Sequence, residues 1–377
     1  MKELAEIIKA YDAAKLSRKQ SVLATIVHLD GSSYRRPGAR MLVLEDGLMI
    51  GAISGGCLEG DALKKALLTF TEKKSRLITY DTSDEEDSSV GVQLGCEGII
   101  QVLFEWLDYN NPTNTVELLR VAVSKRQNSV LVSLYDLSNK KANQIGACLL
   151  KEETGAAIGK LPEFINNDII QKHITEVFET GTSRFTEYEV NGKPLQGFVE
   201  FIQIPVSLVV VGAGNDAIPL MQMADILGWE LRVVDGRKTH AKTDRFINAC
   251  QVLVSKPEAV LEQLPIDSRT CFVLMTHNYQ YDLQMLKALL PLSIPYIGVL
   301  GPRKKLQKML DQLSIEGINP GEEVLSKIYG PTGLDIGAET PEEIASSIIS
   351  EIQAVLNRKN AKMLKWKSDS IHSNTVN

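Results

Sequence analysis

Short apolar strands alternate with helical segments from Val206 to about Leu356, and this pattern constrains the fold more than any other feature. The strand candidates are Ser207–Val211, Leu231–Asp235, Val252–Val254, Cys271–Thr276 and Tyr296–Leu300. Apolar strands that alternate with helices are typical of a parallel sheet covered by helices on both faces. Thr340-Pro341-Glu342-Glu343 has the capping residues that begin a last helix. We therefore predict an α/β fold whose C-terminal part is a Rossmann-like, doubly wound parallel sheet.

The first of these strands runs directly into a glycine turn, Gly212-Ala213-Gly214-Asn215-Asp216-Ala217. Glycines let the backbone approach a phosphate at the start of the following helix, and an acid about 20 residues later holds a ribose hydroxyl. Asp235, at the end of the next strand, has this place. Gly212, Gly214 and Asp235 are therefore candidates for binding a nucleotide, either NAD(P) or another nucleotide. The alternative, glycines that serve close packing only, stays open.

Two further loops are expected at the same edge of the sheet, because ligands bind beyond the carboxyl ends of parallel strands. His277 follows the fourth strand, and Arg303 stands in Gly301-Pro302-Arg303-Lys304-Lys305 after the fifth. Cations at a helix start are opposed by the helix dipole, and an anionic ligand would offset that cost. The alternatives are a structural histidine and a solvated basic patch.

The first half of the chain has a mixed pattern. Asn191-Gly192 joins two alternating runs and predicts a hairpin. We expect a thiol and arginine-loop module over residues 1–110, a mixed α/β continuation of it over 111–205, the Rossmann-like domain over 206–358 and a disordered tail over 359–377.

The loop from Gly31 to Arg40 combines glycines, serines and three arginines. Guanidinium groups bind phosphate through two parallel hydrogen bonds, which suits a small phosphorylated ligand. Gly31, Ser32, Arg35 and Arg40 are the candidate binding residues. A surface turn whose arginines pair with nearby acids is the alternative.

Two cysteines stand in glycine-containing segments. Cys57 lies in Ser54-Gly55-Gly56-Cys57-Leu58-Glu59 at an expected helix start, which stabilises a thiolate, and Cys96 lies in Leu94-Gly95-Cys96-Glu97-Gly98. Soft thiolates suit molybdenum, sulfur transfer or copper. Gly55 and Gly56 would allow a close approach of the ligand, and Glu59 would orient or protonate it or merely favour the helix start. The remaining cysteines adjoin apolar runs and are expected in the core; they are Cys148, Cys250 and Cys271.

Charge and composition exclude several classes of function. The net charge is −6, so no global basic field recruits nucleic acid or a membrane. We expect a cytoplasmic protein because the first residues lack an apolar signal core and no run is long enough to span a membrane. Five cysteines without CxxC spacing argue against a disulfide framework or a structural zinc site.

Taken in order, these segments resemble the XdhC/CoxI family of xanthine dehydrogenase accessory factors. The resemblance rests on the arginine loop, the two cysteine segments, the glycine turn with Asp235-Gly236-Arg237, and the C-terminal motifs that begin at Gly301 and Gly330. Glu97 stands where the family usually has glycine, and an added acid opposes thiolate formation at Cys96.

The resemblance implies binding of molybdenum cofactor (molybdopterin), its sulfuration with sulfur from a cysteine desulfurase, and its insertion into a xanthine dehydrogenase-type enzyme. It implies Cys57 and, more weakly, Cys96 as molybdenum-facing thiols, with Glu59 beside them, and we expect a homodimer. The chain is then a cofactor-maturation factor rather than a metabolic enzyme. Alternative functions are an NAD(P)-dependent oxidoreductase, for which only His277 offers acid–base chemistry, and a nucleotide-sensing adaptor of a dehydrogenase.

Overall fold

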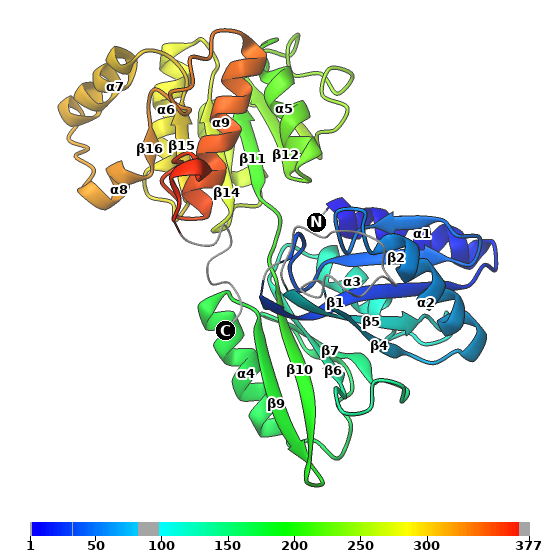
Figure 1. Ribbon diagram of the computed structural model, residues 1–377. Helices are drawn as coiled ribbons and strands as arrows, with labels where there is room; N and C mark the ends of the chain where they lie inside the picture. The colour runs from blue at the N-terminus through cyan, green and yellow to red at the C-terminus, as the bar shows by residue number, and fades with distance from the viewer. Residues whose placement is uncertain (1, 32, 82–97, 369–377) are drawn as a thin grey trace. The chain divides into compact units, whose positions relative to one another are not determined.

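The computed structural model describes residues 2–31, 33–81 and 98–368. The chain forms two compact units, one made of Glu3–Ile204 and one that begins at Pro205. Each unit has its own sheets and core (Figure 1). Among the described residues, no helix is both long and apolar enough to cross a membrane.

The first unit contains two antiparallel five-stranded sheets (Figure 1). The first sheet has the order β3-β2-β1-β5-β4, and the second has the order β8-β7-β6-β10-β9. The strands are β1 (Ser21–Gly31), β2 (Arg40–Leu44), β3 (Met49–Gly51), β4 (Arg76–Asp81), β5 (Gly98–Trp106), β6 (Ser129–Tyr135), β7 (Gly146–Glu152), β8 (Ala157–Gly159), β9 (Arg184–Val190) and β10 (Lys193–Ile202). The predicted hairpin between β9 and β10 is confirmed: Asn191 and Gly192 both have positive φ, as a tight hairpin turn requires.

The cores of this unit lie between its sheets and helices. Helix α2 (Glu59–Glu72) buries Ala62, Ala66 and Phe70 on one face of the first sheet. The opposite face of that sheet packs on α1 (Lys2–Leu16), on α3 (Thr115–Ser124) and on residues of the second sheet. Helix α4 (Asn167–Thr180) covers the outer face of the second sheet (Figure 1). Strand β2 is thus held inside a layered core.

The second unit is built on one parallel six-stranded sheet with the order β13-β12-β11-β14-β15-β16. Numbered within the sheet, this order is 3-2-1-4-5-6, which is that of dinucleotide-binding Rossmann folds. The strands are β11 (Ser207–Val211), β12 (Glu230–Asp235), β13 (Gln251–Val254), β14 (Thr270–Leu274), β15 (Tyr296–Val299) and β16 (Ile328–Tyr329). The predicted α/β class and the parallel sheet are confirmed.

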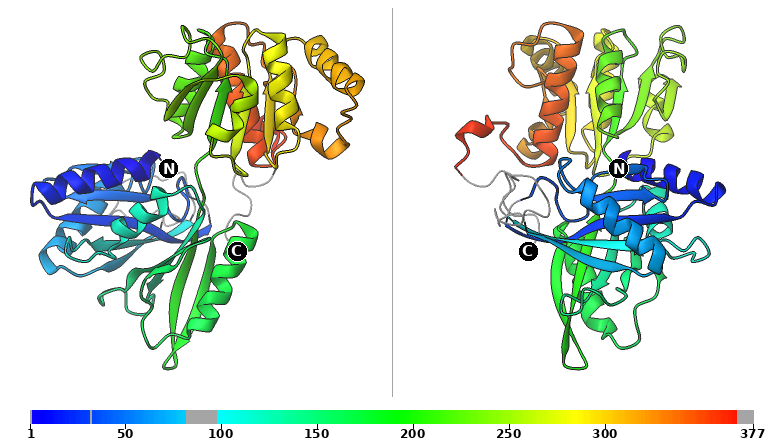
Figure 2. Two further views of the ribbon diagram at one scale, coloured as in Figure 1. Left: turned by 180° about the vertical axis from the view of Figure 1, so that it is seen from behind. Right: turned by 45° about the vertical axis from the view of Figure 1, so that its right-hand side comes forward.

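Helices cover both faces of this sheet, which explains why its strands read as continuous apolar runs. Side chains alternate along β11, so Leu208 and Val210 enter one core while Val209 and Val211 enter the other. The first core is closed by α5 (Ala217–Ile226) and α9 (Pro341–Leu356). The second core is closed by α6 (Tyr279–Leu289) and α7 (Arg303–Ile315). Figure 2 shows the sheet between the two pairs of helices. Thr340 caps α9 through a capping box with Glu343, as its sequence predicts.

Shorter elements complete the second unit: a helical turn α8 (Glu322–Ser326) and three 3₁₀ turns. The part of the predicted tail that the structure describes, residues 359–368, is mostly exposed and holds one of these turns, Leu364–Trp366.

Candidate functional site

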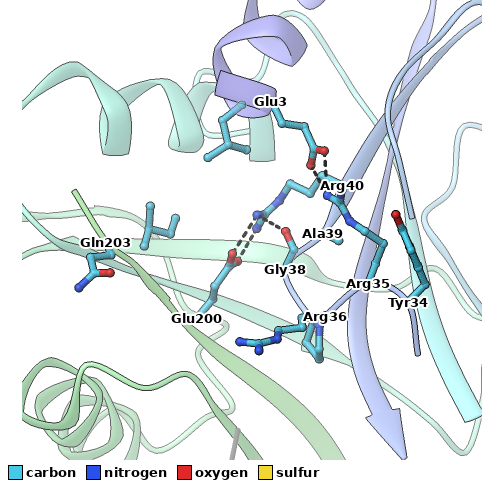
Figure 3. Close-up of a pocket in the computed structure, with 12 residues that line it drawn as sticks. Glu3, Tyr34, Arg35, Arg36, Gly38, Ala39, Arg40, Glu200 and Gln203 are labelled. Carbon is cyan, nitrogen blue, oxygen red and sulfur yellow. Dashed lines mark hydrogen bonds and ion pairs between the residues drawn. The ribbon is translucent and has the colours of Figure 1, made fainter. Parts of the chain in front are cut away.

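The arginine loop between β1 and β2 lines a cavity of about 450 Å³ in the first unit. Its walls carry three guanidinium groups and two carboxylates, so the lining has a net positive charge. Figure 3 shows how these side chains lie around the opening. The lining residues are Glu3, Leu4, Tyr34, Arg35, Arg36, Pro37, Gly38, Ala39, Arg40, Glu200, Ile202 and Gln203.

Arg40 at the start of β2 is the most buried of the three arginines, with an exposure of 2%. Its Nη1 donates to Glu200 Oε1 at 2.9 Å and to the Gly38 carbonyl at 2.8 Å, and its Nη2 donates to Glu200 Oε2 (Figure 3). Glu200 belongs to β10, so the pair joins the two sheets. The prediction that Arg40 binds a cofactor anion is therefore corrected, because a buried carboxylate already occupies its guanidinium.

Arg35 has a different environment. Its Nη2 donates to both carboxylate oxygens of Glu3, at 2.7 and 2.8 Å, and both side chains are about one-third exposed (Figure 3). A partly exposed pair of this kind contributes only about 0–1 kcal/mol. An incoming phosphate can therefore exchange with Glu3 at little cost, so Arg35 remains a candidate anion-binding residue.

The turn that carries Cys57 is held by a hydrogen-bond network around Ser54 and Glu59. The Glu59 carboxylate accepts from the Ser54 amide at 3.0 Å, from the Ser54 hydroxyl and from the Leu58 amide at 3.2 Å. Ser54 Oγ in turn accepts from the amides of Gly56 and Leu58, both at 3.1 Å. Glu59 therefore fixes the conformation of the turn, which supports the structural alternative given for it above.

Cys57 precedes α2 by two residues and is half-buried. Gly56 beside it has φ of +113°, a region that favours glycine, and Gly55 and Gly56 are exposed. The two glycines leave the backbone beside Cys57 exposed, and their role in ligand binding stays a prediction. Cys96, Glu97 and Ser32 lie outside the described residues, and so do the predictions made for the second thiol and for one loop serine.

The arginine loop and the Cys57 turn lie next to each other at Tyr34 and Gly55. A Cβ built on Gly55 would lie 3.5 Å from Tyr34 Cδ1 and Cγ and 3.7 Å from Cδ2. Near-equal distances to three ring atoms mean that the ring lies with its face toward Gly55. The fold thus brings together two motifs that are more than ten residues apart in the sequence.

Gly31, the first residue of the loop segment, is exposed at the end of β1 with φ of +84°.

In the second unit, Asp235 ends β12 beside the glycine turn, but its carboxylate already has several donors. Oδ1 accepts from the Arg237 amide (2.8 Å) and Nε (3.0 Å), and Oδ2 accepts from the Ala213 amide (2.8 Å) and Arg237 Nη2 (2.8 Å). Although burial opposes it, these donors lower the pKa of Asp235. A ribose hydroxyl would have to displace Arg237, which the sequence prediction did not foresee.

The glycine turn itself packs closely. A Cβ on Gly212 would lie 2.4 Å from the Met275 carbonyl oxygen, and one on Gly214 would lie 2.3 Å from Asp216 Oδ1. Close packing on backbone atoms, the alternative given above, is therefore one reason for Gly212, whereas the neighbour of Gly214 is the end of a side chain that can move. Asp216 occupies the position before α5, and its Oδ2 lies 2.9 Å from His277 Nε2. An acid at this helix start competes with a phosphate for the same positive end.

The other predicted residues of the second unit lie just beyond the ends of its strands. His277 is mostly exposed with φ of +57°. It lies at the same edge of the sheet as Gly212, because it follows β14, the neighbour of β11, and contacts Asp216. Arg303 is exposed at the first position of α7, whereas Lys305 is held by Asp282 Oδ2 at 2.7 Å. The same unit has a cavity of about 580 Å³ lined by the loop Pro331–Ala338 with residues of α9. No cluster of three or more metal-binding side chains occurs in the described ranges.

The sequence prediction missed three polar residues of the first cavity: Glu3, Glu200 and Gln203. A signal existed for Glu200, which is a single acid within the apolar run from Phe198 to Ile202. The expectation for Cys250 was wrong, because this thiol is exposed just before β13, whereas Cys271 is buried in β14 as expected.

Both units of the chain are similar to known proteins. Residues 208–352 match the XdhC Rossmann domain, and residues 15–81 match the XdhC and CoxI family. The chain is 31% identical over 346 residues to a probable xanthine dehydrogenase subunit of Bacillus subtilis (strain 168), covering 90% of this chain and 94% of that protein. It is 25% identical over 342 residues to the molybdenum cofactor insertion chaperone PaoD of Escherichia coli (strain K12), covering 91% and 85%.

A solved structure agrees with these matches. The crystal structure of a protein described as a xanthine dehydrogenase from Bacillus halodurans superposes with a TM-score of 0.76 at 28% identity, covering 95% of this chain and 98% of that one. The resemblance inferred from the motifs is therefore confirmed. The chain belongs to the XdhC and CoxI family.

Proposed function

We propose that this chain binds molybdenum cofactor and supports its sulfuration and its insertion into a xanthine dehydrogenase-type enzyme. The observation that carries the proposal is the contact of Tyr34 with Gly55, which puts an arginine-lined cavity beside a glycine-rich turn with a half-buried thiol. The Escherichia coli relative is named a molybdenum cofactor insertion chaperone, which supports the same role.

The residues fit the chemistry of such a cargo. Guanidinium groups match a phosphate, and Arg35 can exchange its exposed pair with Glu3 for a ligand anion. A thiolate is a soft ligand suited to molybdenum or to carrying sulfur. In this proposal Arg35 holds the phosphate, Arg40 supports the loop through Glu200, and Cys57 faces the metal end of the cargo, with Cys96 as a second candidate.

The partners follow from the same role. The Bacillus subtilis relative carries the name of a xanthine dehydrogenase component, which supports a xanthine dehydrogenase-type client for this chain. A cysteine desulfurase would supply the sulfur, and a homodimer would present two cargo sites. We place the work of the protein in cofactor maturation and not in metabolite turnover.

The test is purification of the full chain from a host that makes molybdenum cofactor, followed by fluorescence of the oxidised pterin and by metal analysis. The wild type should carry both pterin and molybdenum. Arg35→Ala should lose both, whereas Cys57→Ala should lose molybdenum more than pterin. Absence of pterin from the wild type would refute the proposal. Gel filtration with the client apoenzyme tests the partner.

A nucleotide-sensing role is a second candidate, favoured by the 3-2-1-4-5-6 strand order and the glycine turn. An NAD(P)-dependent oxidoreductase is less well supported, because Asp235 is held by Arg237 and Asp216 stands at the helix start. Calorimetric titration with NAD⁺, NADP⁺ and AMP distinguishes these two roles. Binding that Gly214→Val abolishes, without turnover of an aldehyde or purine, would favour the adaptor.

A further inference from the structure

Tyr34 is an unusual aromatic residue because its side chain is 69% exposed although it lines a cavity. Large aromatic side chains are mostly buried, and an exposed ring in a polar cavity is a feature of sites that stack planar ligands. One face of this ring lies toward Gly55, so the ring stands on the backbone of the Cys57 turn.

The support beneath the ring is fixed. Ser54 and Gly56, on either side of Gly55, are both held in the network that Glu59 completes. Buried Leu58 and Ile53 anchor the two ends of the turn in the core. The turn beneath the ring is therefore ordered before a ligand arrives, and a preorganised surface loses less entropy on binding.

The chemistry around the ring defines the ligand. Arg35, the next residue, offers an exchangeable guanidinium for an anionic group, and the cavity of about 450 Å³ is of the size that holds a small organic ligand. An aromatic face beside guanidinium groups suits a planar heterocycle that carries a phosphate.

We infer that Tyr34 is the stacking platform for the heterocycle of the bound cargo, which would lie on the face of the tyrosine ring opposite Gly55, beside the arginine loop. This inference rests on the proposed function for the identity of the ring, which is then a pterin. It assigns to Tyr34 a ligand-contacting role that is separate from the anion binding by Arg35.

The experiment compares the wild type with three variants of the full chain from a cofactor-producing host. Tyr34→Phe keeps the ring, Tyr34→Leu keeps apolar bulk without the ring, and Phe164→Leu is a matched control at a similarly exposed aromatic (55%) outside the cavity. Stacking losses at nucleic-acid sites correspond to roughly 5- to 150-fold in affinity. We expect Tyr34→Phe and Phe164→Leu to retain pterin as the wild type does, and Tyr34→Leu to retain about a tenth or less.

The second arm identifies the ring. Each protein, freed of ligand, is titrated with the oxidised, phosphorylated pterin derived from molybdenum cofactor and with GMP, so that both probes carry a phosphate, and binding is followed by ligand fluorescence and by calorimetry. Weaker binding of the pterin to Tyr34→Leu than to Tyr34→Phe supports the inference, whereas tighter binding of GMP than of the pterin overturns the pterin assignment. Thermal unfolding should be unchanged in all variants because both side chains are exposed.

The outcomes separate the two proposals. If the wild type carries no pterin, the proposed function fails. If the wild type carries pterin and Tyr34→Leu carries as much, the function stands and the stacking role of Tyr34 is overturned. Equal losses in Tyr34→Phe and Tyr34→Leu would also overturn it, because they would point to the hydroxyl rather than the ring.

Discussion

Removal of the Glu200 carboxylate should destabilise the first unit strongly. Glu200→Ala leaves the guanidinium of Arg40, a residue only 2% exposed, with the Gly38 carbonyl alone still accepting from Nη1. Breaking a buried ion pair by deleting one partner costs about 3–5 kcal/mol, because an uncompensated charge remains in the interior. Few single substitutions in this unit should cost more.

The assay is urea unfolding followed through Trp106 of β5 in a Trp229→Phe, Trp366→Phe background, so that the fluorescence reports the first unit alone. With a urea dependence of about 2 kcal/mol per molar, the loss corresponds to a midpoint lower by about 1.5–2.5 M. The background protein without the Glu200 substitution is the reference.

The matched control replaces both partners by apolar residues. Arg40→Met with Glu200→Leu removes both buried charges, so its stability should lie much closer to the wild type than that of Glu200→Ala. A midpoint shift below about 0.5 M for Glu200→Ala would refute the reasoning. It would mean that water or another group compensates Arg40 when Glu200 is absent.

Three further predictions concern other buried or capped groups. Burial raises the pKa of Glu105 above its ordinary value of 4.5, against the hydrogen bonds it accepts from Ala147 and Thr115. The folded chain therefore holds a proton that the unfolded chain loses, and the resulting stabilisation is lost as pH rises from 4.5 through the raised pKa. In urea titrations, the unfolding free energy of Glu105→Gln relative to the wild type should increase between about pH 4 and 7. A difference that stays constant with pH would contradict this prediction. Iodoacetamide should label the exposed Cys250 in the native protein. It should label Cys271 only in denaturant, because this thiol is buried and burial raises its pKa to about 12; peptide mass spectrometry measures both. Thr340→Ala should destabilise the second unit by about 1 kcal/mol because α9 loses its N-terminal cap, whereas Thr340→Ser should be nearly neutral. Both variants are followed through Trp229 fluorescence. If the alanine variant is as stable as the wild type, another group caps the helix in place of Thr340.

The parts of the fold that sequence could predict are those set by local pattern. The apolar run Ser207–Val211 is a strand buried on both faces, and the Asn191-Gly192 turn closes a hairpin, because each depends on a few adjacent residues. The face-to-face packing of the two sheets in the first unit was not predicted. It depends on which strand faces meet across the core, and no short segment carries that information.

In the candidate site, too, features set by adjacent residues could be predicted, and features set by distant residues could not. The turn at Cys57 and its helix were predicted from spacing, and the structure places them as expected. The role of Arg40 was not, because its partner Glu200 is 160 residues away. The partner of Asp235 was within reach of the sequence, since Arg237 follows two residues later and a carboxylate at a strand end can fold back onto such a neighbour.

In the proposed function, two arginines of one loop have opposite roles, and their burial distinguishes them. Both are paired with a glutamate, so pairing alone does not distinguish an anion-binding residue from a structural one. For Arg35 the exchange of Glu3 for a ligand phosphate replaces one solvated anion by another and costs little. For Arg40 the same exchange would bring Glu200 out of the core and disrupt the junction of the two sheets. In the proposed function, Arg40 therefore holds the loop in place through Glu200 while Arg35 is open to exchange its partner.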